Sequence, residues 1–391
     1  MFKRWLDLSK AKKSILLLGP RRSGKSTYLK MMFPNYRYMT FDDLDILEHS
    51  KSDPMGWIQK LGTNFIIDEV QRNPLITVAV KWAIDEKKVH CILTGSTGLN
   101  LLDKSSETLA GRIQIFYMTP ICFGENFGPA LTLKEFQNQF EIHKIAQREL
   151  EVFKAFGGFP EVITCLDEEK SDLLNIYKNS YFTREIAQLN NIENIEGLRV
   201  LFFALIRGLG SRYEVSSLLK ETGLSTPTVK KYLNTLMQSG LLFKLYGYHL
   251  SETKRYLSSA KSYFIDVGIL QALSDDFSTG QLIESFVISE IEKRRLLGYI
   301  KTDSLFYYES AGGREIDLVY EEAHRVTAIE IKSTKNISGK DLRNLREFEI
   351  KSKKNLRKII YYMGHEFYHE GSKDQKIEIR PISSFFRTQE I

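Results

Sequence analysis

The stretch Ser14-Ile-Leu-Leu-Leu-Gly-Pro-Arg-Arg-Ser-Gly-Lys-Ser-Thr27 places an apolar run directly before a glycine-rich loop. It fills the phosphate-loop pattern G-x-x-x-x-G-K-[ST] with Gly19, Gly24, Lys25 and Ser26. The glycines let successive N–H groups point at one anion, and a helix that follows adds its positive N-terminus. The stretch therefore predicts a nucleoside triphosphate site behind the first strand of a parallel sheet.

Individual residues of this loop have distinct expected roles. Lys25 is expected to neutralise the β- and γ-phosphates of ATP, and the Ser26 hydroxyl to ligate Mg²⁺. The alternative, a plain glycine turn, is disfavoured by the apolar strand before the loop and the amphipathic Thr27–Met32 after it. The other loop residues expected to contact the nucleotide are Gly19, Arg22, Ser23, Gly24 and Thr27.

A second apolar run, Asn64-Phe-Ile-Ile-Asp-Glu69, ends in two acids, which is typical of a buried strand in a parallel sheet. Asp68 is expected to hold the magnesium shell, and Glu69 to orient or deprotonate the attacking water. A third apolar run ends at Ser96. Two interpretations of Ser96 stay open, a contact to the γ-phosphate and a helix N-cap.

Arg112 precedes a further apolar run, Ile113–Tyr117. An arginine here is expected to stabilise transition-state charge, either in its own subunit or in a neighbour's within a homo-oligomer. The alternative is a surface arginine that pairs with a carboxylate. Arg21 and Arg22, inside the phosphate loop, are further candidates for the same role.

The composition excludes several classes of protein. The 391 residues are enough for two or three domains. Three scattered cysteines without a C-x-x-C pair argue against a disulfide framework or a zinc site, and suit a reducing cytoplasm. No apolar run approaches the ~20 residues of a membrane helix, and the basic start lacks a signal-peptide core. We therefore expect a cytoplasmic protein without a membrane partner.

Basic charge is concentrated between residues 207 and 261. This segment holds nine Lys or Arg and three Glu, so its excess of six equals the net charge of the whole chain. A localised basic module is the usual footprint of phosphate-backbone binding. The charge pattern therefore predicts DNA as a partner.

The same segment has a recognisable order of elements. It predicts a helix over Val215–Glu221, a glycine turn, a second helix capped by Ser225, and a strand over Leu241–Tyr248. This order is typical of a winged helix-turn-helix, whose alternative use is protein interaction or packing. The residues off the apolar face of the second helix, expected to touch a groove or phosphates, are Lys230, Lys231 and Asn234.

The last third of the chain holds a second group of chemically active residues. Strands are predicted over Leu305–Ser310, Glu315–Tyr320 and Arg325–Lys332, with a glycine turn joining the first two. Glu330 and Lys332 are two residues apart and share a face of their strand. The neighbouring strand carries Asp317, and a preceding amphipathic helix carries Glu284.

These residues predict a metal site that acts on a phosphodiester. Glu284, Asp317 and Glu330 are the expected ligands of Mg²⁺ or Mn²⁺. Lys332 is the expected catalytic lysine, which steers the nucleophile or offsets developing charge. The alternative is a solvated face on which Lys332 simply pairs with Glu330.

With these motifs the chain resembles bacterial and archaeal ATP-binding proteins that join an AAA-type ATPase domain to a C-terminal domain of unknown function. That C-terminal domain has a restriction-endonuclease-like, PD-(D/E)xK fold. The resemblance spans nearly the whole chain and implies ATP hydrolysis and a nuclease-like C-terminal half. One departure is Ile316, which stands where the signature has a proline before Asp317. The matching motifs are Gly19–Ser26, Ile67–Gln71, Leu93–Ser96, Leu109–Arg112, Gly157–Pro160, Tyr263–Gly268, Glu284, Glu315–Asp317 and Glu330–Lys332.

We therefore predict an α/β protein of four parts. These are a P-loop AAA-type ATPase core with a parallel sheet over 1–125, a helical lid or extension over 126–206, a winged helix-turn-helix over 207–256 and an α/β restriction-endonuclease-like domain over 257–391. Two functions stay open. One is an ATP-dependent enzyme that acts on DNA and cuts it at the C-terminal site. The other is a nucleotide-gated DNA- or protein-binding switch or scaffold with an inactive nuclease-like domain.

Overall fold

The computed structural model describes residues 2–96, 109–178, 192, 194–249, 259–274, 276–310, 312–350, 354–371, 376–389 and 391. The chain forms two compact units. The N-terminal unit comprises residues 4–120 with 238–240, and the C-terminal unit comprises residues 1–3, 121–237 and 241–391. Each unit is α/β and has its own hydrophobic core.

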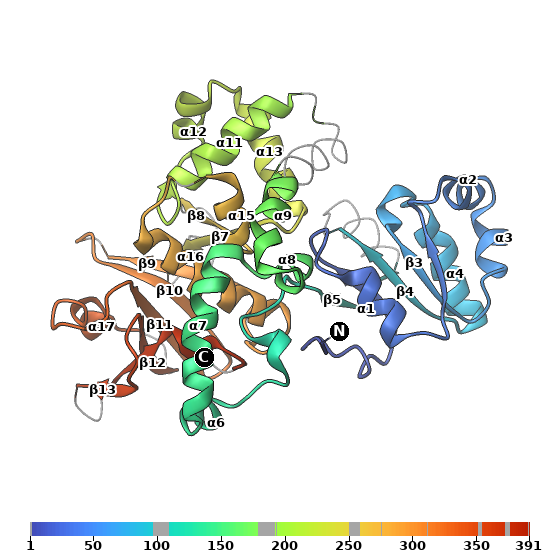
Figure 1. The fold of residues 1–391 in the computed structure, drawn as a ribbon. Helices are drawn as coiled ribbons and strands as arrows, with labels where there is room; N and C mark the ends of the chain where they lie inside the picture. Colours follow the sequence, from blue (N-terminus) through green and yellow to red (C-terminus); the bar gives the residue numbers. More distant parts are fainter. Residues whose placement is uncertain are drawn as a thin grey trace. The chain divides into compact units, whose positions relative to one another are not determined.

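The N-terminal unit is built on a parallel sheet whose described strands lie in the order β2-β3-β4-β1-β5 (Figure 1). The strands are β1 (Ser14–Leu18), β2 (Arg37–Thr40), β3 (Asn64–Asp68), β4 (His90–Gly95) and β5 (Ile113–Tyr117). The helices are α1 (Lys25–Met32), α2 (Leu44–Ser52), α3 (Pro54–Gln59), η1 (Val70–Arg72) and α4 (Ile76–Lys87). Helices cover the sheet, so its central strands β1 and β3 are buried and apolar. The predicted parallel sheet is confirmed.

The C-terminal unit contains a mixed sheet in the order β13-β14-β12-β11-β10-β9-β7-β8-β6. Strands β9, β10 and β11 are antiparallel neighbours, whereas β11, β12 and β14 run parallel. The strands are β6 (Arg212–Tyr213), β7 (Leu242–Gly247), β8 (Ala260–Phe264), β9 (Leu305–Glu309), β10 (Glu315–Glu321), β11 (Arg325–Lys332), β12 (Asn355–Tyr362), β13 (Tyr368–Glu370) and β14 (Ile377–Pro381). The strands expected for a winged module therefore share one sheet with the strands of the C-terminal domain.

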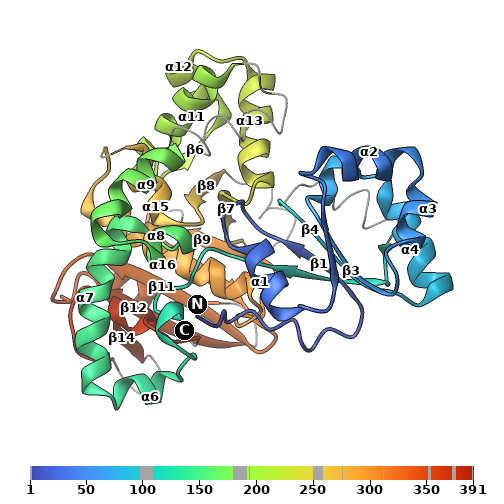
Figure 2. The same ribbon diagram turned by 45° about the vertical axis from the view of Figure 1, so that its right-hand side comes forward.

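The C-terminal unit also contains helices from distant parts of the sequence, most of which pack on one core. They are α6 (Leu133–Gln137), α7 (Phe140–Phe156), α8 (Pro160–Thr164), α9 (Lys170–Ile176), α11 (Ile195–Arg207), α12 (Val215–Thr222), α13 (Thr226–Gln238), α15 (Val267–Leu273), α16 (Thr279–Leu296) and α17 (Arg343–Glu347), with η2 (Glu125–Phe127), η3 (Asp167–Glu169) and η5 (Ile382–Phe385). Figures 1 and 2 show α11, α12 and α13 together at one end, beside β7 and β8.

The helical region 126–206 differs from the prediction of a lid that extends the ATPase core. Its apolar side chains, such as Phe153 of α7 and Leu201 of α11, join the same core as Phe286 of α16. This shared burial places the described part of the region in the C-terminal unit.

A buried ion cluster holds α16 in the centre of the C-terminal unit. Lys293 Nζ lies 3.0 Å from both Asp266 and Glu290, and Arg294 Nη1 lies 2.5 Å from Glu290. All four side chains are at most 1% exposed. Burial by itself raises the pKa of Glu290, but Lys293 and Arg294 outweigh that effect and hold its pKa below the ordinary value. The cluster therefore joins two acids to two bases, although burial raises the pKa of Asp266.

Backbone groups of distant segments complete this cluster. Glu290 accepts a hydrogen bond from Phe123 N at 2.9 Å, and Asp266 accepts one from Gly158 N at 2.8 Å. Arg294 donates to the carbonyls of Phe385 and Thr388 at 2.8 and 2.9 Å. The cluster thus fixes three segments, around residues 123, 158 and 385–388, to α16.

The Gly-Gly turn between α7 and α8 owes its composition to this cluster. Gly157 has a φ of 72°, and a Cβ there would lie 1.9 Å from Asp266 Oδ1. Only glycine combines that backbone conformation with so close a carboxylate.

We expect Glu290→Ala to lower the free energy of unfolding of the C-terminal unit by about 3–5 kcal/mol, since it leaves Arg294 without its carboxylate partner and Lys293 with Asp266 alone. Urea unfolding followed by circular dichroism measures the loss. Trp5, Trp57 and Trp82, all the tryptophans of the chain, lie in the N-terminal unit, so tryptophan fluorescence follows that unit separately.

Glu196→Ala is the matched control, because Glu196 pairs with Arg199 on an exposed face of α11. It should change the free energy of unfolding by less than about 1 kcal/mol. Equal losses in the two variants would contradict the role given to the buried cluster.

Candidate functional sites

The phosphate loop follows β1 and has the backbone that its glycines predict. Gly24 has a φ of 90° and immediately precedes α1. A Cβ on Gly19 would lie 2.1 Å from the carbonyl oxygen of Met118, so that position also requires glycine. Arg22 adopts a φ of 61°, and Thr27 is exposed on the first turn of α1. The first turn of α1 points its free N–H groups into this loop.

Lys25 is buried at the centre of the loop. Its ammonium donates hydrogen bonds to the carbonyls of Gly19 and Pro20, both at 2.9 Å. Burial lowers the pKa of Lys25, and the nearby carboxylates of Glu69 and Asp68 partly offset this effect. The lysine is therefore held among loop carbonyls, with acidic groups of β3 beside it.

Ser26 and Asp68 meet at the carboxyl edge of the parallel sheet. Ser26 Oγ donates to Asp68 Oδ2 at 2.6 Å, although β4 separates β1 from β3 in the sheet. Tyr38 also donates its hydroxyl hydrogen to Asp68. A serine hydroxyl and a carboxylate are the hard oxygen donors that Mg²⁺ prefers.

Glu69 stands at the end of a chain of polar contacts. It has a φ of 57°, and its Oε2 lies 3.6 Å from Arg21 Nη2. Gln71 Nε2 donates to Glu69 and, at 3.2 Å, to Ser96 Oγ. The expected water-activating acid and the expected γ-phosphate contact are thereby joined by Gln71, a residue to which the sequence analysis gave no role.

The residues of this site fit a magnesium nucleotide. The Ser23 hydroxyl is buried and has no hydrogen-bond partner within the described residues. It lies between Arg22 and Gly24 in a loop that also presents the Lys25 ammonium. An orphaned hydroxyl, a buried cation and the paired Ser26 and Asp68 oxygens match the chemistry of phosphates and Mg²⁺.

Arg112 lies at the opposite edge of the sheet. Strand β5 pairs in parallel with β1, with Ile113 beside Ser14 and Tyr117 beside Leu18. Arg112 is therefore about 20 Å of strand away from the start of the phosphate loop, at about 3.3 Å per residue. Its Nε donates to Asp85 at 2.7 Å. The expectation of a role in its own subunit is corrected by this geometry, and a role in a neighbour's site stays a prediction.

Three carboxylates and a lysine of the C-terminal unit converge at β10 and β11. Leu318 pairs with Ile329, so one residue further along Asp317 faces Glu330 across the two strands. Asp317 accepts a hydrogen bond from Ile331 N at 2.7 Å, and Lys332 Nζ lies 2.9 Å from Glu330. A register shift in β10 between residues 316 and 319 marks a bulge or irregularity in the segment that contains Asp317.

Glu284 joins this group from α16. It accepts a hydrogen bond from Tyr263 at 2.5 Å. Burial and the charge of Asp317 raise the pKa of Glu284 to about 7 and that of Glu330 to about 8. Because Asp317 acts on both glutamates, the three carboxylates form one electrostatic group.

The group is not a formed metal site. Within the described residues, no three His, Cys, Asp or Glu side chains are arranged to hold a metal ion. Glu330 is paired with Lys332, and Glu284 accepts from Tyr263. The donor types suit Mg²⁺ or Mn²⁺, but their present arrangement does not, so the predicted shared ion has no direct support.

Three residues of this site received no role from their sequence position. Lys261 and Tyr263 come from β8, and Asn344 from α17 donates to Glu330 at 3.1 Å. Tyr263 is part of a family motif, but nothing in a strand sequence announces that its hydroxyl reaches Glu284. Long-range packing alone reveals these contacts.

The exposed helix α13 has the surface expected of it. Lys230, Lys231 and Asn234 are exposed, whereas Val229 and Leu233 are buried. These positions separate a polar face from an apolar face, as the helical period predicts.

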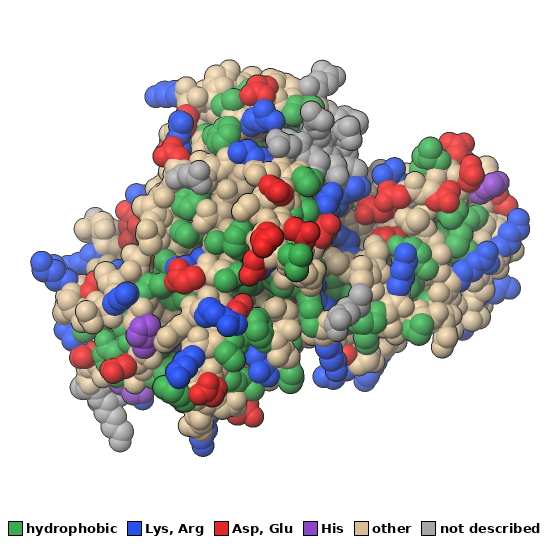
Figure 3. Space-filling model, viewed as in Figure 1, with side chains coloured by type: hydrophobic (Ala, Val, Ile, Leu, Met, Phe, Trp, Pro, Cys, Tyr) green, Lys and Arg blue, Asp and Glu red, His purple; other side chains and the backbone are tan. Residues whose placement is uncertain are grey.

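The basic excess of this region is nevertheless smaller on the surface than in the sequence. Arg207 pairs with Glu221 and Asp276, Arg212 pairs with Glu309, and Lys261 is buried. Residues 254 and 255 lie outside the described residues. Figure 3 shows acidic as well as basic side chains over the α11 and α12 end.

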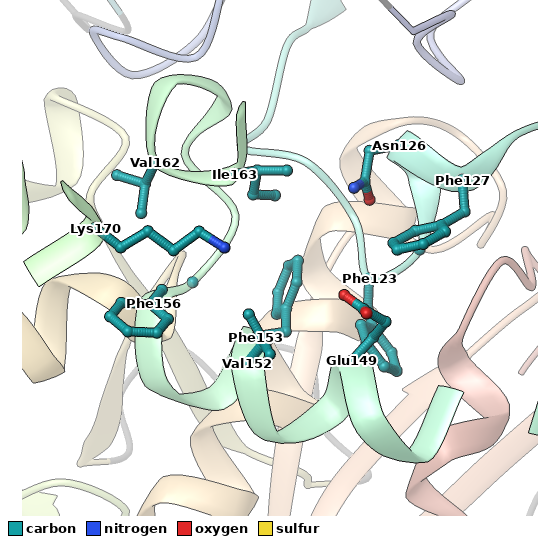
Figure 4. A pocket seen from close by; sticks show the side chains of 12 residues that line it. Phe123, Asn126, Phe127, Glu149, Val152, Phe153, Phe156, Val162, Ile163 and Lys170 are labelled. Atoms are coloured by element: carbon teal, nitrogen blue, oxygen red, sulfur yellow. The ribbon is translucent and has the colours of Figure 1, made fainter. Parts of the chain in front are cut away.

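Two cavities of the C-terminal unit lie away from the carboxylates. One, of about 50 Å³, lies between α7 and α8; Figure 4 shows Phe153 and Lys170 at it. Lys170 is already paired with Asp167 at 2.5 Å. The other, of about 150 Å³, includes His365 and Lys335. Both are small beside the roughly 300 Å³ or more of a typical ligand pocket.

Three family models match different parts of the chain. Residues 11–127 match the model of an AAA domain. Residues 279–385 match the model of a domain of unknown function, DUF4143, so the AAA domain is joined to a C-terminal domain of unknown function. Residues 147–279, between them, match a further domain of unknown function, DUF8612. The AAA domain, of the P-loop ATPase family, contains the phosphate loop, Asp68 and Glu69.

Relatives cover most of the chain. An uncharacterised protein of Methanocaldococcus jannaschii is 27% identical over 94% of this chain and 86% of its own length. One of Mycobacterium tuberculosis is 24% identical over 82% of this chain and 70% of its own. Among solved structures, a signal transduction ATPase with numerous domains from Pyrococcus horikoshii, which carries a tetratricopeptide repeat sensor, is 13% identical. The match covers 72% of this chain and 43% of that protein, with a TM-score of 0.20. This TM-score is too low for its fold or function to be assigned to this chain.

No helix among the described residues has the length and apolar character that a membrane crossing needs.

The raised pKa values predict that the stability of the C-terminal unit falls as the pH rises. Glu284 and Glu330, whose ordinary pKa is 4.5, keep protons to about pH 7 and 8 when folded, so unfolding releases protons in that interval. Asp317→Asn removes the repulsion acting on both. It should raise the free energy of unfolding at pH 8 by on the order of 1–2 kcal/mol, and by less at pH 5.

Glu378→Gln is a control that should change the free energy of unfolding in the opposite direction. Although burial raises the pKa of Glu378, Arg357 and Arg380 outweigh it and lower that pKa to about 2. This carboxylate stabilises the fold at both pH 5 and pH 8, so its loss should destabilise at both. Urea unfolding at the two pH values checks both variants, and a destabilised Asp317→Asn chain at pH 8 would contradict the repulsion.

Proposed function

We propose that the chain is a Mg²⁺-dependent ATP hydrolase that acts on DNA. The observation that carries the ATPase part is the 2.6 Å contact between Ser26 and Asp68, which joins two separate sequence motifs beside the Lys25 ammonium. A bound magnesium nucleotide would supply the reactive phosphate. The chain's own residues then divide the work: Lys25 binds phosphate, Ser26 and Asp68 hold the cation, and Glu69 with Gln71 positions the attacking water.

Lys25→Ala should abolish nucleotide binding, because it removes the buried charge that faces the phosphates. Glu69→Gln should bind nucleotide normally but lower turnover by about 100-fold or more, since it removes the base and spares the phosphate contacts. Binding of a fluorescent nucleotide and release of phosphate measure the two effects. Lys10→Ala, an exposed lysine paired with Asp7, is the control. Native turnover by Glu69→Gln would refute its assignment as the base.

The DNA-binding part of the proposal rests on α13 and the strands around it. The order α11, β6, α12, α13, β7, β8, in which β6 and β7 both pair with β8, supports the proposal of a winged helix-turn-helix. Its second helix exposes Lys230, Lys231 and Asn234. Two adjacent lysines on such a helix suit contacts to phosphates of the DNA backbone.

Reversing the charge of Lys230 and Lys231 to Glu should weaken DNA binding and reduce the slope of log affinity against log salt by about one to two, since two phosphate contacts are lost. Fluorescence titrations at several salt concentrations measure both. Reversal of Lys134 and Lys144, exposed lysines of α6 and α7, applies the same charge change elsewhere in the unit. Equal losses in both double variants would indicate a net-charge effect and remove α13 from the interface.

We also propose that the carboxylate group of β10, β11 and α16 is a nuclease-like site, which cuts the DNA. The order α16, β9, β10, β11, α17, β12, in which β9, β10 and β11 are antiparallel and β12 is parallel to β11, supports a restriction-endonuclease-like domain. Within it α16, β10 and β11 carry Glu284, Asp317, Glu330 and Lys332. The catalytic role of Lys332 is to offset charge near the reacting phosphate.

A second candidate function is a nucleotide-gated switch or scaffold that binds DNA or protein through an inactive nuclease-like domain. The observation that favours it is the pairing of Glu330 with Lys332, in a group that is not arranged as a metal site. Fold and grafted chemistry can part company, so the domain can be a docking surface.

Plasmid cleavage in Mg²⁺ or Mn²⁺ distinguishes the two functions. Asp317→Ala should remove any cation-dependent cleavage, because Asp317 lies across from Glu330 on the neighbouring strand. It should leave ATP hydrolysis unchanged, because Asp317 lies outside the AAA domain. Asp303→Ala, an exposed carboxylate of the same unit, is the control. Absence of cleavage by the unmodified chain with either cation would favour the scaffold.

A further inference from the structure

The carboxylate site contains a second lysine, Lys261, on strand β8. Its side chain is 4% exposed, and within the described residues the acceptor that it contacts is the carboxylate of Glu315. The ring of Tyr307 lies 5.3 Å from the ammonium. Strand β8 is not a neighbour of β10, the strand of Glu315, so this ion pair spans strands that are separated in the sheet.

Lys261 belongs to the same electrostatic group as the proposed nuclease residues. Its charge acts on both Glu284 and Asp317, from a strand that also supplies Tyr263 to Glu284. Lys332, the lysine assigned from the sequence, is bound to Glu330 at 2.9 Å. The site thus has two ammonium groups, and each is covered by one glutamate.

The two covering glutamates differ in their freedom to move. Glu330 is 2% exposed and also accepts from Asn344, so other side chains hold it in place. The side chain of Glu315 is 42% exposed, and it lies two residues before Asp317 on the same strand. A half-exposed glutamate can rotate into water at little cost, whereas a buried one cannot.

Charge explains what the Glu315 side chain does at this position. The carboxyl groups of Glu284, Glu315, Asp317 and Glu330 lie around two lysines, and each one that is ionised repels an approaching phosphodiester. If Glu315 turns away, one negative charge leaves the site and the Lys261 ammonium is uncovered. An ammonium is a compact point charge with three donors, well suited to phosphate oxygens.

We propose that Lys261 is the phosphate-binding lysine of this site and that the Glu315 carboxylate occupies it until a phosphodiester of DNA displaces it. The proposal rests on the proposed action on DNA, but it concerns binding and needs no metal ion or cleavage. Lys261 therefore holds the DNA backbone at the carboxylates, and Glu315 competes with the DNA.

Binding of a fluorescent DNA duplex in EDTA tests this competition. Glu315→Gln should tighten binding by about tenfold, because the uncharged amide holds the ammonium less strongly. One added phosphate contact should steepen the slope of log affinity against log salt by about 0.9. Lys261→Met in the Glu315→Gln background should abolish both gains. Circular dichroism checks that each variant folds.

Glu322→Gln is the matched control, because Glu322 follows β10 and is paired with Arg325 at 2.9 Å. It removes the same charge from the same sheet and should change affinity less than about twofold. A Glu315→Gln chain with wild-type affinity, whatever that affinity is, overturns the proposal. So does a double variant that keeps the gain, since the DNA would then respond to net charge alone.

The outcome is separable from that of the proposed function. If Glu315→Gln tightens binding in EDTA but no plasmid is cut in Mg²⁺ or Mn²⁺, Lys261 is a DNA-binding residue of an inactive site. If cleavage depends on Asp317 and binding is unchanged by Glu315→Gln, the nuclease assignment stands and the role of Lys261 falls.

Discussion

The C-terminal unit depends on the buried ion cluster of Asp266, Glu290, Lys293 and Arg294. Two acids and two bases are charge-balanced there, and backbone groups of distant segments satisfy their remaining hydrogen bonds. Such a cluster is costly to desolvate, so its value lies in fixing one arrangement of chain segments rather than in stability alone. Helix α16 is thereby held in a single position.

The same helix carries a second buried group with the opposite character. Glu284 lies about one and two-thirds turns before Glu290, at 3.6 residues per turn, and interacts electrostatically with Asp317. In the carboxylate group the acids outnumber the lysines, and burial, together with repulsion from Asp317, raises the pKa values of Glu284 and Glu330. Because the ion cluster holds α16 in place, it also positions Glu284, one of the acids of the carboxylate group. Excess buried charge of one sign is a feature of binding and catalytic sites rather than of structural cores.

The N-terminal unit uses the carboxyl edge of a parallel sheet in a comparable way. Its strands bring the phosphate loop, Asp68 and Ser96 to one edge, as expected for crevices outside the ends of such strands. Gln71 then couples Ser96 to Glu69 by hydrogen bonds. Arg112 belongs to the other edge, so the topology that assembles this site also separates Arg112 from it.

The sequence alone determined the features that depend on local geometry. The phosphate loop, strand β3 and the hairpin of β9 with β10 follow from glycines, apolar runs and alternation within a few residues. Tertiary structure decided the rest, because contacts between strands far apart in the chain leave no periodic signal. In the sequence Lys261 is one of the nine basic residues between 207 and 261, whereas in the fold it is buried beside Glu315. Charge near a site is set by burial and pairing, which only the folded chain provides.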